Sequence, residues 1–265
     1  MSAVAIQNGV PTPLPTSGEV VLSVRDVGKT YGPAGNHVLA LEGISLEVKK
    51  GEFVCLVGAS GCGKSTLLNL VSGLDHLSHG EIRMDGRPTL LFQEAALFPW
   101  MTAAANIELP LRLAKVGREQ RRAEVESLLR LVHLDGFGDK RPHELSGGMR
   151  QRVAVARAFA QHADILLMDE PFGALDAMTR DLLHDELERI WRETGVTIVF
   201  VTHNVREAVR LGDRIVVLTS RPGRVAEEFP VDLPRPRNTS GPEVAELAVT
   251  VTERLRAEVR RHADD

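Results

Sequence analysis

Short apolar runs recur along the chain, and longer segments with helical spacing separate them. Residues 53–58, 165–169, 197–202 and 214–219 are almost wholly apolar. Runs of this length are typical of strands that are buried on both faces of a parallel sheet. Because helical stretches alternate with these runs, the pattern predicts an α/β domain with a parallel core.

Helical periodicity is clearest in the middle of the chain. Within residues 121–134, four apolar side chains recur at i, i+3, i+4 and i+7 from Val125 to Val132, on one face of a helix. Further helices are predicted over 65–74, from about 148 to 162, over 177–194 and over 242–262. By contrast, residues 20–27 and 41–53 alternate apolar and polar side chains, which predicts half-buried antiparallel strands.

The composition narrows the class of protein. The chain has 265 residues, 43% hydrophobic and 26% charged, with a formal net charge of -4. These values are ordinary for a soluble globular protein and argue against a dedicated nucleic-acid binder, which usually has a basic face. Two cysteines in a chain of this size exclude a disulfide scaffold and indicate a reducing, cytosolic compartment.

Neither a secretory signal nor a membrane span is visible in the sequence. The N-terminus lacks a charged-then-apolar leader, and no uncharged apolar run approaches the roughly 20 residues that cross a bilayer. Residues 1–18 contain Pro11, Pro13 and Pro15 and are predicted to form a disordered tail. If the protein acts at a membrane, we expect it to dock on another subunit.

The segment GASGCGKST matches G-x-x-x-x-G-K-[ST] and lies between an apolar strand and a predicted helix. Its glycines let backbone N–H groups surround phosphates, Lys64 would reach the β- and γ-phosphate oxygens, and the Ser65 hydroxyl would ligate Mg²⁺. We expect alkylation of Cys62 to block nucleotide binding. The alternative is a glycine-rich turn without a ligand. The predicted binding residues are Gly58, Ala59, Ser60, Gly61, Cys62, Gly63, Lys64, Ser65 and Thr66.

Acidic residues follow the next apolar run. Asp169 ends a predicted strand, where a carboxylate can hold Mg²⁺, and Glu170 can polarise an attacking water as a general base. The alternatives are a solvated pair or a helix cap. His203 follows another strand, at the edge of a parallel sheet where ligands bind. It could bond the γ-phosphate, although a lone histidine is more often structural.

A second glycine-rich segment, ELSGGMRQR at 144–152, also precedes a predicted helix. Its small residues and its helix N-terminus would suit a phosphate as well. Six segments together, GASGCGKST, LLFQE, LSGGMRQR, ILLMDEP, GALD and VTH, occur in the order found in ATP-binding subunits of ATP-binding-cassette (ABC) transporters. From about Val20 to Pro236, the chain resembles these subunits.

The resemblance implies the fold and its division. It implies a P-loop NTPase core, which is a mostly parallel sheet with flanking helices, plus an antiparallel β subdomain and an inserted α-helical subdomain. The expected boundaries are a disordered tail at 1–18, the ATP-binding domain at 19–240 with its helical subdomain at about 95–160, and a C-terminal helix at 241–265.

The resemblance also implies roles for further residues. Tyr31 matches the aromatic that stacks on adenine, although it could be a packed strand residue. Gln93 matches the glutamine that contacts Mg²⁺ and the attacking water, and Asp176 matches the aspartate that links two sites across a dimer. Ser146, Gly147 and Gly148 match the family signature. The resemblance implies head-to-tail dimers with two ATP molecules, each between one subunit's phosphate loop and the other's signature.

The implied catalytic residues are Glu170, His203, Gln93 and Lys64, and the implied metal ligands are Ser65, Gln93 and Asp169, with ATP and Mg²⁺ as cofactors. The segments 91–111, 169–180 and 217–225 look most like the nitrate, sulfonate and taurine importers. That resemblance implies separate membrane permease subunits, an extracytoplasmic solute-binding protein acting indirectly, and a place on the cytoplasmic face of the inner membrane. Phe98, Pro99 and Trp100 would form part of the permease-docking groove, or else ordinary core.

Two other classes of function remain to be weighed. A soluble ABC ATPase that acts on nucleic acid or ribosomes usually carries two cassettes or a long coiled coil, and this chain shows one cassette without sustained heptads. A scaffold that does not hydrolyse ATP is disfavoured by the presence of Lys64, Asp169, Glu170 and His203. We therefore expect a transport ATPase that does not bind nucleic acid.

Overall fold

The larger sheet forms the centre of the molecule. The computed structural model describes residues 18–33, 36–173, 175–239 and 241–264. The sheet has six strands in the order β5-β6-β7-β3-β8-β9, in which only the β8–β9 pair is antiparallel. The strands are β3 (Phe53–Val57), β5 (Pro88–Leu91), β6 (Ile165–Asp169), β7 (Thr197–Thr202), β8 (Arg214–Leu218) and β9 (Val225–Pro230). The predicted parallel core is confirmed.

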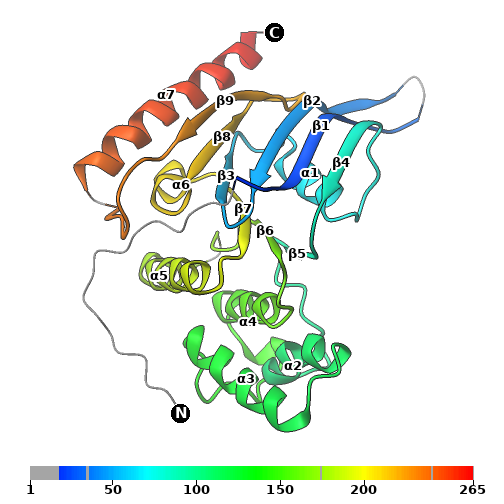
Figure 1. Cartoon of the computed structure of the whole chain (residues 1–265), viewed down its shortest axis with the longest axis vertical. Coiled ribbons are helices and arrows are strands. Elements are labelled where there is room, and N and C mark those ends of the chain that lie inside the picture. Colours follow the sequence, from blue (N-terminus) through cyan, green and yellow to red (C-terminus); the bar gives the residue numbers. More distant parts are fainter. Residues whose placement is uncertain (1–17, 34–35, 174, 240, 265) are drawn as a thin grey trace.

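A second, antiparallel sheet lies beside the first, as Figure 1 shows. It contains β1 (Val20–Tyr31), β2 (Val38–Lys49) and β4 (His79–Met84) in the order β2-β1-β4. The alternating segment at 41–53 does not form one strand. The chain turns at Lys50 and Gly51, where Gly51 has a φ of 74°, and the segment therefore contributes to both sheets.

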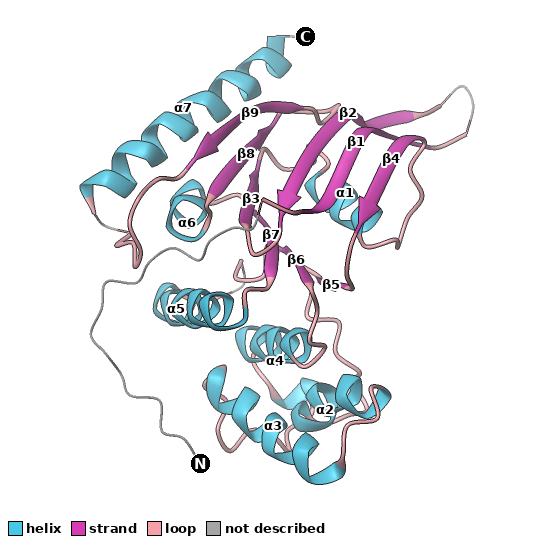
Figure 2. Ribbon diagram, in the orientation of Figure 1, coloured by secondary structure: helices cyan, strands magenta, loops and turns pink. Residues whose placement is uncertain are grey.

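Helices gather at the end of the molecule that is farthest from the antiparallel sheet (Figure 2). They are α2 (Ala103–Leu113), α3 (Arg118–Leu131), the short helix η1 (Pro142–Glu144) and α4 (Gly147–Phe159). Helix α3 ends before the apolar periodicity does, because His133 adopts a left-handed φ of 53°. Arg152 Nη1 donates to the carbonyls of Val132 and His133 at 3.1 and 3.0 Å, which joins the end of α3 to α4.

The remaining helices flank the sheets. They are α1 (Lys64–Val71), α5 (Ala177–Thr194), α6 (Val205–Leu211) and α7 (Pro242–Asp264). Helix α7 packs against α6 and β8. The segment before it is fixed by Arg237, which donates to the carbonyls of Val209 and Val231 at 2.9 Å each. Burial lowers the pKa of Arg237 to about 10, so it stays cationic at neutral pH.

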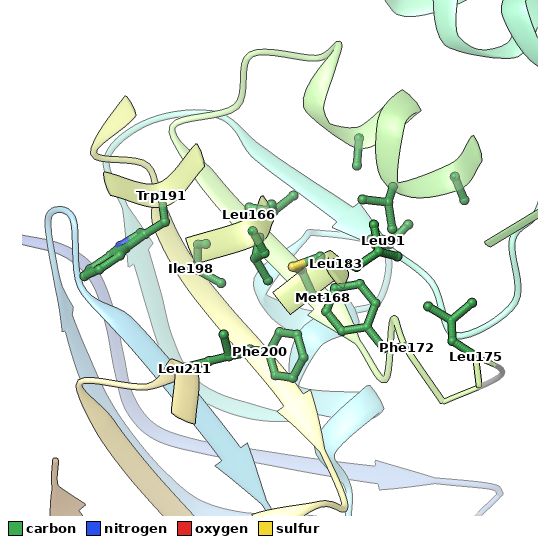
Figure 3. Close-up of a cluster of buried hydrophobic side chains, with 14 of the residues drawn as sticks. Leu91, Leu166, Met168, Phe172, Leu175, Leu183, Trp191, Ile198, Phe200 and Leu211 are labelled. Carbon is green, nitrogen blue, oxygen red and sulfur yellow. The ribbon is translucent and has the colours of Figure 1, made fainter. Parts of the chain in front are cut away.

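Side chains from both faces of the large sheet are buried, which explains why its strands read as continuous apolar runs. In β3, Phe53, Cys55 and Val57 join one hydrophobic cluster, whereas Val54 and Leu56 join another. Figure 3 shows part of the first cluster, in which Phe200 and Phe172 lie beside Met168. This double burial makes the sheet a rigid base for loops at its edge.

Several short elements of the fold have no sequence pattern that predicts them. Strands β4, β5 and β9 and helices α2 and α6 are absent from the prediction, because they are short or lack clear periodicity. The predicted tail at 1–18 lies outside the described residues, except for Gly18. Within the described part of the chain, no helix is long and apolar enough to cross a membrane.

Candidate nucleotide-binding and catalytic site

The phosphate loop, residues 58–65, connects β3 to α1. Gly63 is the N-cap of α1 and has a φ of 100°, which an L side chain rarely adopts. A Cβ on Gly63 would also lie 2.5 Å from Leu41 Cδ2. The loop therefore requires glycine there, and its curvature leaves the N-terminus of α1 open toward a ligand. Such a terminus attracts anions through its free N–H groups and the helix dipole.

Lys64 is the first residue of α1 and is 6% exposed. Its Nζ donates to the carbonyls of Gly58 at 2.9 Å and Ala59 at 3.0 Å. The ammonium group is therefore held inside the curve of the loop. A buried cation at this point adds to the positive potential of the helix N-terminus and favours a polyanionic ligand.

A pocket of about 330 Å³ brings distant segments of the sequence together. The phosphate loop, Gln93, Glu170 and Arg221 meet because they follow strands whose carboxyl ends share one edge of the large sheet. The pocket is completed by residues of β1 and β2 in the antiparallel sheet. The site residues predicted from the sequence that line this pocket are Tyr31, Ser60, Gly61, Gly63, Lys64, Ser65, Thr66, Gln93 and Glu170. Val38, Ala40 and Arg221 also line it and were not predicted.

Asp169 ends β6 next to the phosphate loop. Burial raises the pKa of its carboxyl group, and the Ser65 hydroxyl and the Lys64 ammonium act in the opposite direction. The oxygens of Ser65, Asp169 and Gln93 are the hard donors that Mg²⁺ prefers, with the remaining positions left for water and phosphate. These residues therefore fit Mg²⁺ bound together with a nucleotide.

Glu170, which lines the pocket, contacts His203, which does not line it. Glu170 has a left-handed φ of 44°, and its N–H donates to Val201 O at 3.0 Å. His203 Nδ1 lies 2.9 Å from Glu170 Oε2. This contact holds the carboxylate beside the imidazole at the edge of the sheet, where both could act on a bound phosphate.

Behind this pair lies a buried polar network that was not predicted. The Thr202 hydroxyl donates to Glu207, whose other carboxylate oxygen lies 2.6 Å from His184 Nε2. Arg210 lies on the far side of His184 and donates to Asp185 at 2.6 Å. Thr202 directly precedes His203, so the network anchors the loop that carries the histidine. Only the burial of α5 against α6 brings these residues together.

Tyr31 is 39% exposed, so the alternative of a packed strand residue is wrong. Its hydroxyl donates to Asp75 Oδ2 at 2.8 Å, and Lys29 Nζ lies 4.7 Å from the centre of its ring. Hydrogen bonds from Lys29 and Tyr31 lower the pKa of Asp75 to about 2. Tyr31 thus stands at the pocket with its orientation fixed by two charged neighbours.

The side chain of Cys62 is buried in the folded protein. Its side chain belongs to the hydrophobic core below the loop and is 1% exposed. Burial also raises the pKa of its thiol, which disfavours the reactive thiolate. The buried thiol is therefore a poor target for alkylation in the folded protein, and the expectation that alkylation of Cys62 blocks nucleotide binding stays a prediction.

The signature segment, residues 144–152, lies at the start of α4 and does not line this pocket. Ser146 caps α4 by accepting from Met149 N at 3.2 Å. Ser146 and Gly147 are exposed. A Cβ on Gly148 would lie 3.1 Å from Leu175, next to Asp176, which caps α5 through Thr179 N at 3.0 Å. The structure therefore places the signature beside Asp176 and apart from the phosphate loop.

Comparison with known proteins identifies the family. The family model described as "ABC transporter" matches residues 41–173. The chain is 46% identical over 229 residues to the aliphatic sulfonates import ATP-binding protein SsuB of Bacillus licheniformis, which covers 83% of this chain and 89% of that protein. The chain belongs to the ABC transporter family. Membership confirms the predicted ATPase with ATP and Mg²⁺.

Two further relatives of this ABC ATPase carry other solute names. It is 44% identical over 234 residues to the taurine import ATP-binding protein TauB of Rhizobium johnstonii, covering 85% of this chain and 89% of that protein. It is 47% identical over 228 residues to the bicarbonate transport ATP-binding protein CmpC of Synechococcus elongatus. That match covers 82% of this chain but only 34% of the longer CmpC.

A solved structure of the cassette MJ0796, a dimer in a post-hydrolysis state bound to ADP and phosphate, has the same fold as this ABC ATPase. The TM-score is 0.74 at 35% identity, over 80% of this chain and 99% of that one. This likeness confirms the predicted fold class.

The aromatic group after Gln93 lies on the surface of the ABC ATPase. Trp100 is 68% exposed, and its ring centre lies 5.6 Å from that of Phe98. The alternative of ordinary core is therefore wrong for Trp100. Arg157 of helix α4 fixes this segment, because its guanidinium group donates to the carbonyls of Ala96 and Ala95 at 2.9 and 3.1 Å.

Proposed function

We propose that this ABC ATPase is the ATP-hydrolysing subunit of a multi-subunit importer and works as a head-to-tail dimer with a second copy of itself. The observation that supports this most strongly is the separation of the two glycine-rich segments. The phosphate loop lines a pocket with Gln93 and Glu170, whereas the signature lies elsewhere with its Ser146 exposed. A partner copy can supply the missing signature, as the dimeric state of the similar cassette suggests.

Within one subunit, each residue has a distinct task. Lys64 and the N–H groups of the loop bind the phosphate chain, and Tyr31 stacks on the adenine. Ser65, Asp169 and Gln93 would hold Mg²⁺, which would neutralise charge on the phosphate oxygens. Glu170 accepts a proton from the attacking water, and His203 holds Glu170 and bonds the γ-phosphate.

The partner's signature completes the site. Ser146 and the N–H groups of Gly147 and Gly148 would contact the γ-phosphate in trans, and Asp176 beside them would link the two sites. Interactions with the γ-phosphate exist only in the closed dimer, so ATP favours closure and hydrolysis removes that preference. This differential affinity is the free energy that drives the transport cycle.

We further propose that permease subunits dock at the exposed group around Trp100. An exposed aromatic on a firmly held segment is a good anchor for a partner helix. Because Arg157 of α4 holds this segment and Ser146 begins α4, docking there can move the signature as one body with the subdomain. The subunit would then lie on the cytoplasmic face of the inner membrane, and an extracytoplasmic solute-binding protein would act on it only through the permease.

The solute is proposed from the relatives alone. SsuB, TauB and CmpC are named for aliphatic sulfonates, taurine and bicarbonate. These solutes share a small size and an anionic oxygen group. We propose a small solute of this class, with nitrate as another member. Binding assays on the cognate solute-binding protein would identify it, because the solute does not contact this subunit.

Co-purification tests the assembly. The tagged full-length chain, isolated in mild detergent from cells that carry its neighbouring genes, should bring down an integral membrane subunit. Trp100→Ala should abolish that co-purification and leave the basal ATPase of the isolated subunit unchanged. Leu74→Ala, which changes another exposed apolar side chain at 61% exposure, is the matched control. Co-purification of ribosomes or DNA without a permease would instead support the rival function.

A further inference from the structure

The turn between β8 and β9, residues 219–224, is closed by its own hydrogen bonds. Thr219 N donates to Arg224 O at 2.9 Å, and Arg224 N donates to Thr219 Oγ1 at 2.9 Å. The Thr219 hydroxyl donates in turn to Pro222 O at 2.8 Å. Three bonds within six residues give this turn one defined shape.

The same turn is fixed against the phosphate loop. Gly223 N donates to Ala40 O at 2.9 Å, and Glu42 N donates to Gly223 O at 3.0 Å, which joins the turn to β2. A Cβ on Gly223 would lie 2.1 Å from Cys62 O. The backbone of the turn therefore touches the backbone of the phosphate loop, at a distance that only glycine allows.

This arrangement places Arg221 at the nucleotide pocket. Its Nη2 lies 3.6 Å from the Cβ position of Gly61, and Arg221 lines the pocket together with Lys64 and Ser65. Among the described residues that line this pocket, Lys64 and Arg221 are the two cations. Arg224, in the same turn, is paired with Glu42 at 3.2 Å. No carboxylate of the described chain pairs with Arg221 within salt-bridge distance.

We propose that Arg221 binds the phosphate chain of the nucleotide in its own subunit. The inference rests on the proposed function, because it extends the same nucleotide site. A guanidinium group matches phosphate oxygens through two parallel N–H donors. Lys64 is already held by loop carbonyls, so Arg221 supplies the second positive charge that lines the pocket. None of the six family segments includes Arg221.

Nucleotide affinity in Arg221→Ala, measured by calorimetry at one fixed salt concentration, tests the proposal. The Kd values for ADP and ATP should rise about tenfold, as expected for loss of a charge-assisted hydrogen bond, whereas weak binding of adenosine should not change. Arg221→Lys should recover part of the loss. Arg224→Ala is the matched control, since it removes the same charge from the same turn. It should lower the melting temperature without changing the ratio of ADP to adenosine affinity.

Three results would overturn the assignment. Equal weakening of adenosine and ATP would show a structural role, and unchanged ADP and ATP affinities would show that Arg221 makes no phosphate contact. If Arg221→Ala does not fold, Arg221→Lys is the deciding variant. Wild-type affinity of Arg221→Lys for ADP and ATP, together with a wild-type dependence of that affinity on salt, would contradict a contact that requires the guanidinium geometry. Failure of the unmodified protein to bind ATP would instead contradict the proposed function.

Discussion

The two glycine-rich segments of this protein differ in how their helix N-termini are used. At the phosphate loop, the N-cap of α1 is Gly63 in a left-handed conformation, and no side chain caps the helix. At the signature, Ser146 has an extended conformation and caps α4 through Met149 N. The first segment curves around a pocket within the chain, whereas the second presents an exposed terminus. Similar composition therefore encloses a pocket in one place and, as we propose, contacts a partner subunit in the other.

The surroundings of the two segments differ as well. The phosphate loop inserts the Cys62 side chain into the hydrophobic core, and Gly223 and Leu41 pack against the loop. The signature contacts Leu175 through Gly148, while Ser146 and Gly147 face outward. We infer that one segment forms its site by folding and the other by association. Substitutions in and around each segment would separate these two contributions.

Glu170→Gln should have the largest effect. Loss of the general base should lower kcat by about 100- to 10,000-fold, while both glycine-rich segments stay intact. Because ATP would persist, the variant should accumulate as an ATP-bound dimer, which light scattering with and without ATP would detect. A variant that hydrolyses ATP normally and stays monomeric would contradict the role of Glu170.

Ser146→Arg changes only the signature segment. The large cation should prevent closure and lower ATPase activity by at least about 100-fold, because transition-state donors from the partner are lost. ATP affinity of the monomer, measured by equilibrium dialysis, should stay close to that of the unmodified protein. Loss of ATP binding with normal dimer formation would show that the signature acts within its own subunit.

Tyr31→Ala tests the part of the nucleotide site that lies within one subunit. Loss of stacking on adenine should weaken ATP binding to the monomer by about 1–3 kcal/mol, which is about 5- to 150-fold. Tyr31→Phe is the control, since it keeps the ring but removes the hydroxyl bond to Asp75. If calorimetry shows equal losses for both variants, the hydroxyl rather than the ring is responsible.

Asp75→Asn should have the smallest effect, and that effect should depend on pH. The pKa of Asp75 is lowered from 3.8 to about 2, so its stabilising contacts are complete above about pH 4 and are lost as the pH falls toward 2. The variant should therefore melt at a lower temperature than the unmodified protein at pH 7. Melting curves at several pH values should converge near pH 2, and a constant difference would refute this origin.

Much of the fold and of the candidate site could be predicted from the sequence, because residues that are close together in the chain determine these features. Double burial produces apolar strands, so β3, β6, β7 and β8 could be read directly. The loop at 58–65 needs glycines, a lysine and a hydroxyl at fixed spacing, so the sequence alone identifies it. Helix α5 was predicted at its observed bounds, because its cap and its periodicity agree.

Other features were decided only by tertiary structure. Arg221, Gly223, His184 and Glu207 lack a local pattern. The turn that carries Arg221 and Gly223 lies against the phosphate loop, and His184 contacts Glu207 because α5 lies against α6. The side chain of Cys62 is inaccessible because it is buried, and the side chain of Trp100 is exposed at the surface. The spacing of residues along the sequence indicates neither. The sequence alone determined which chemical groups the chain carries and which local turns and helix caps hold them. Packing determined which groups face the nucleotide, because distances between segments far apart in sequence are fixed only when both faces of the sheet are covered.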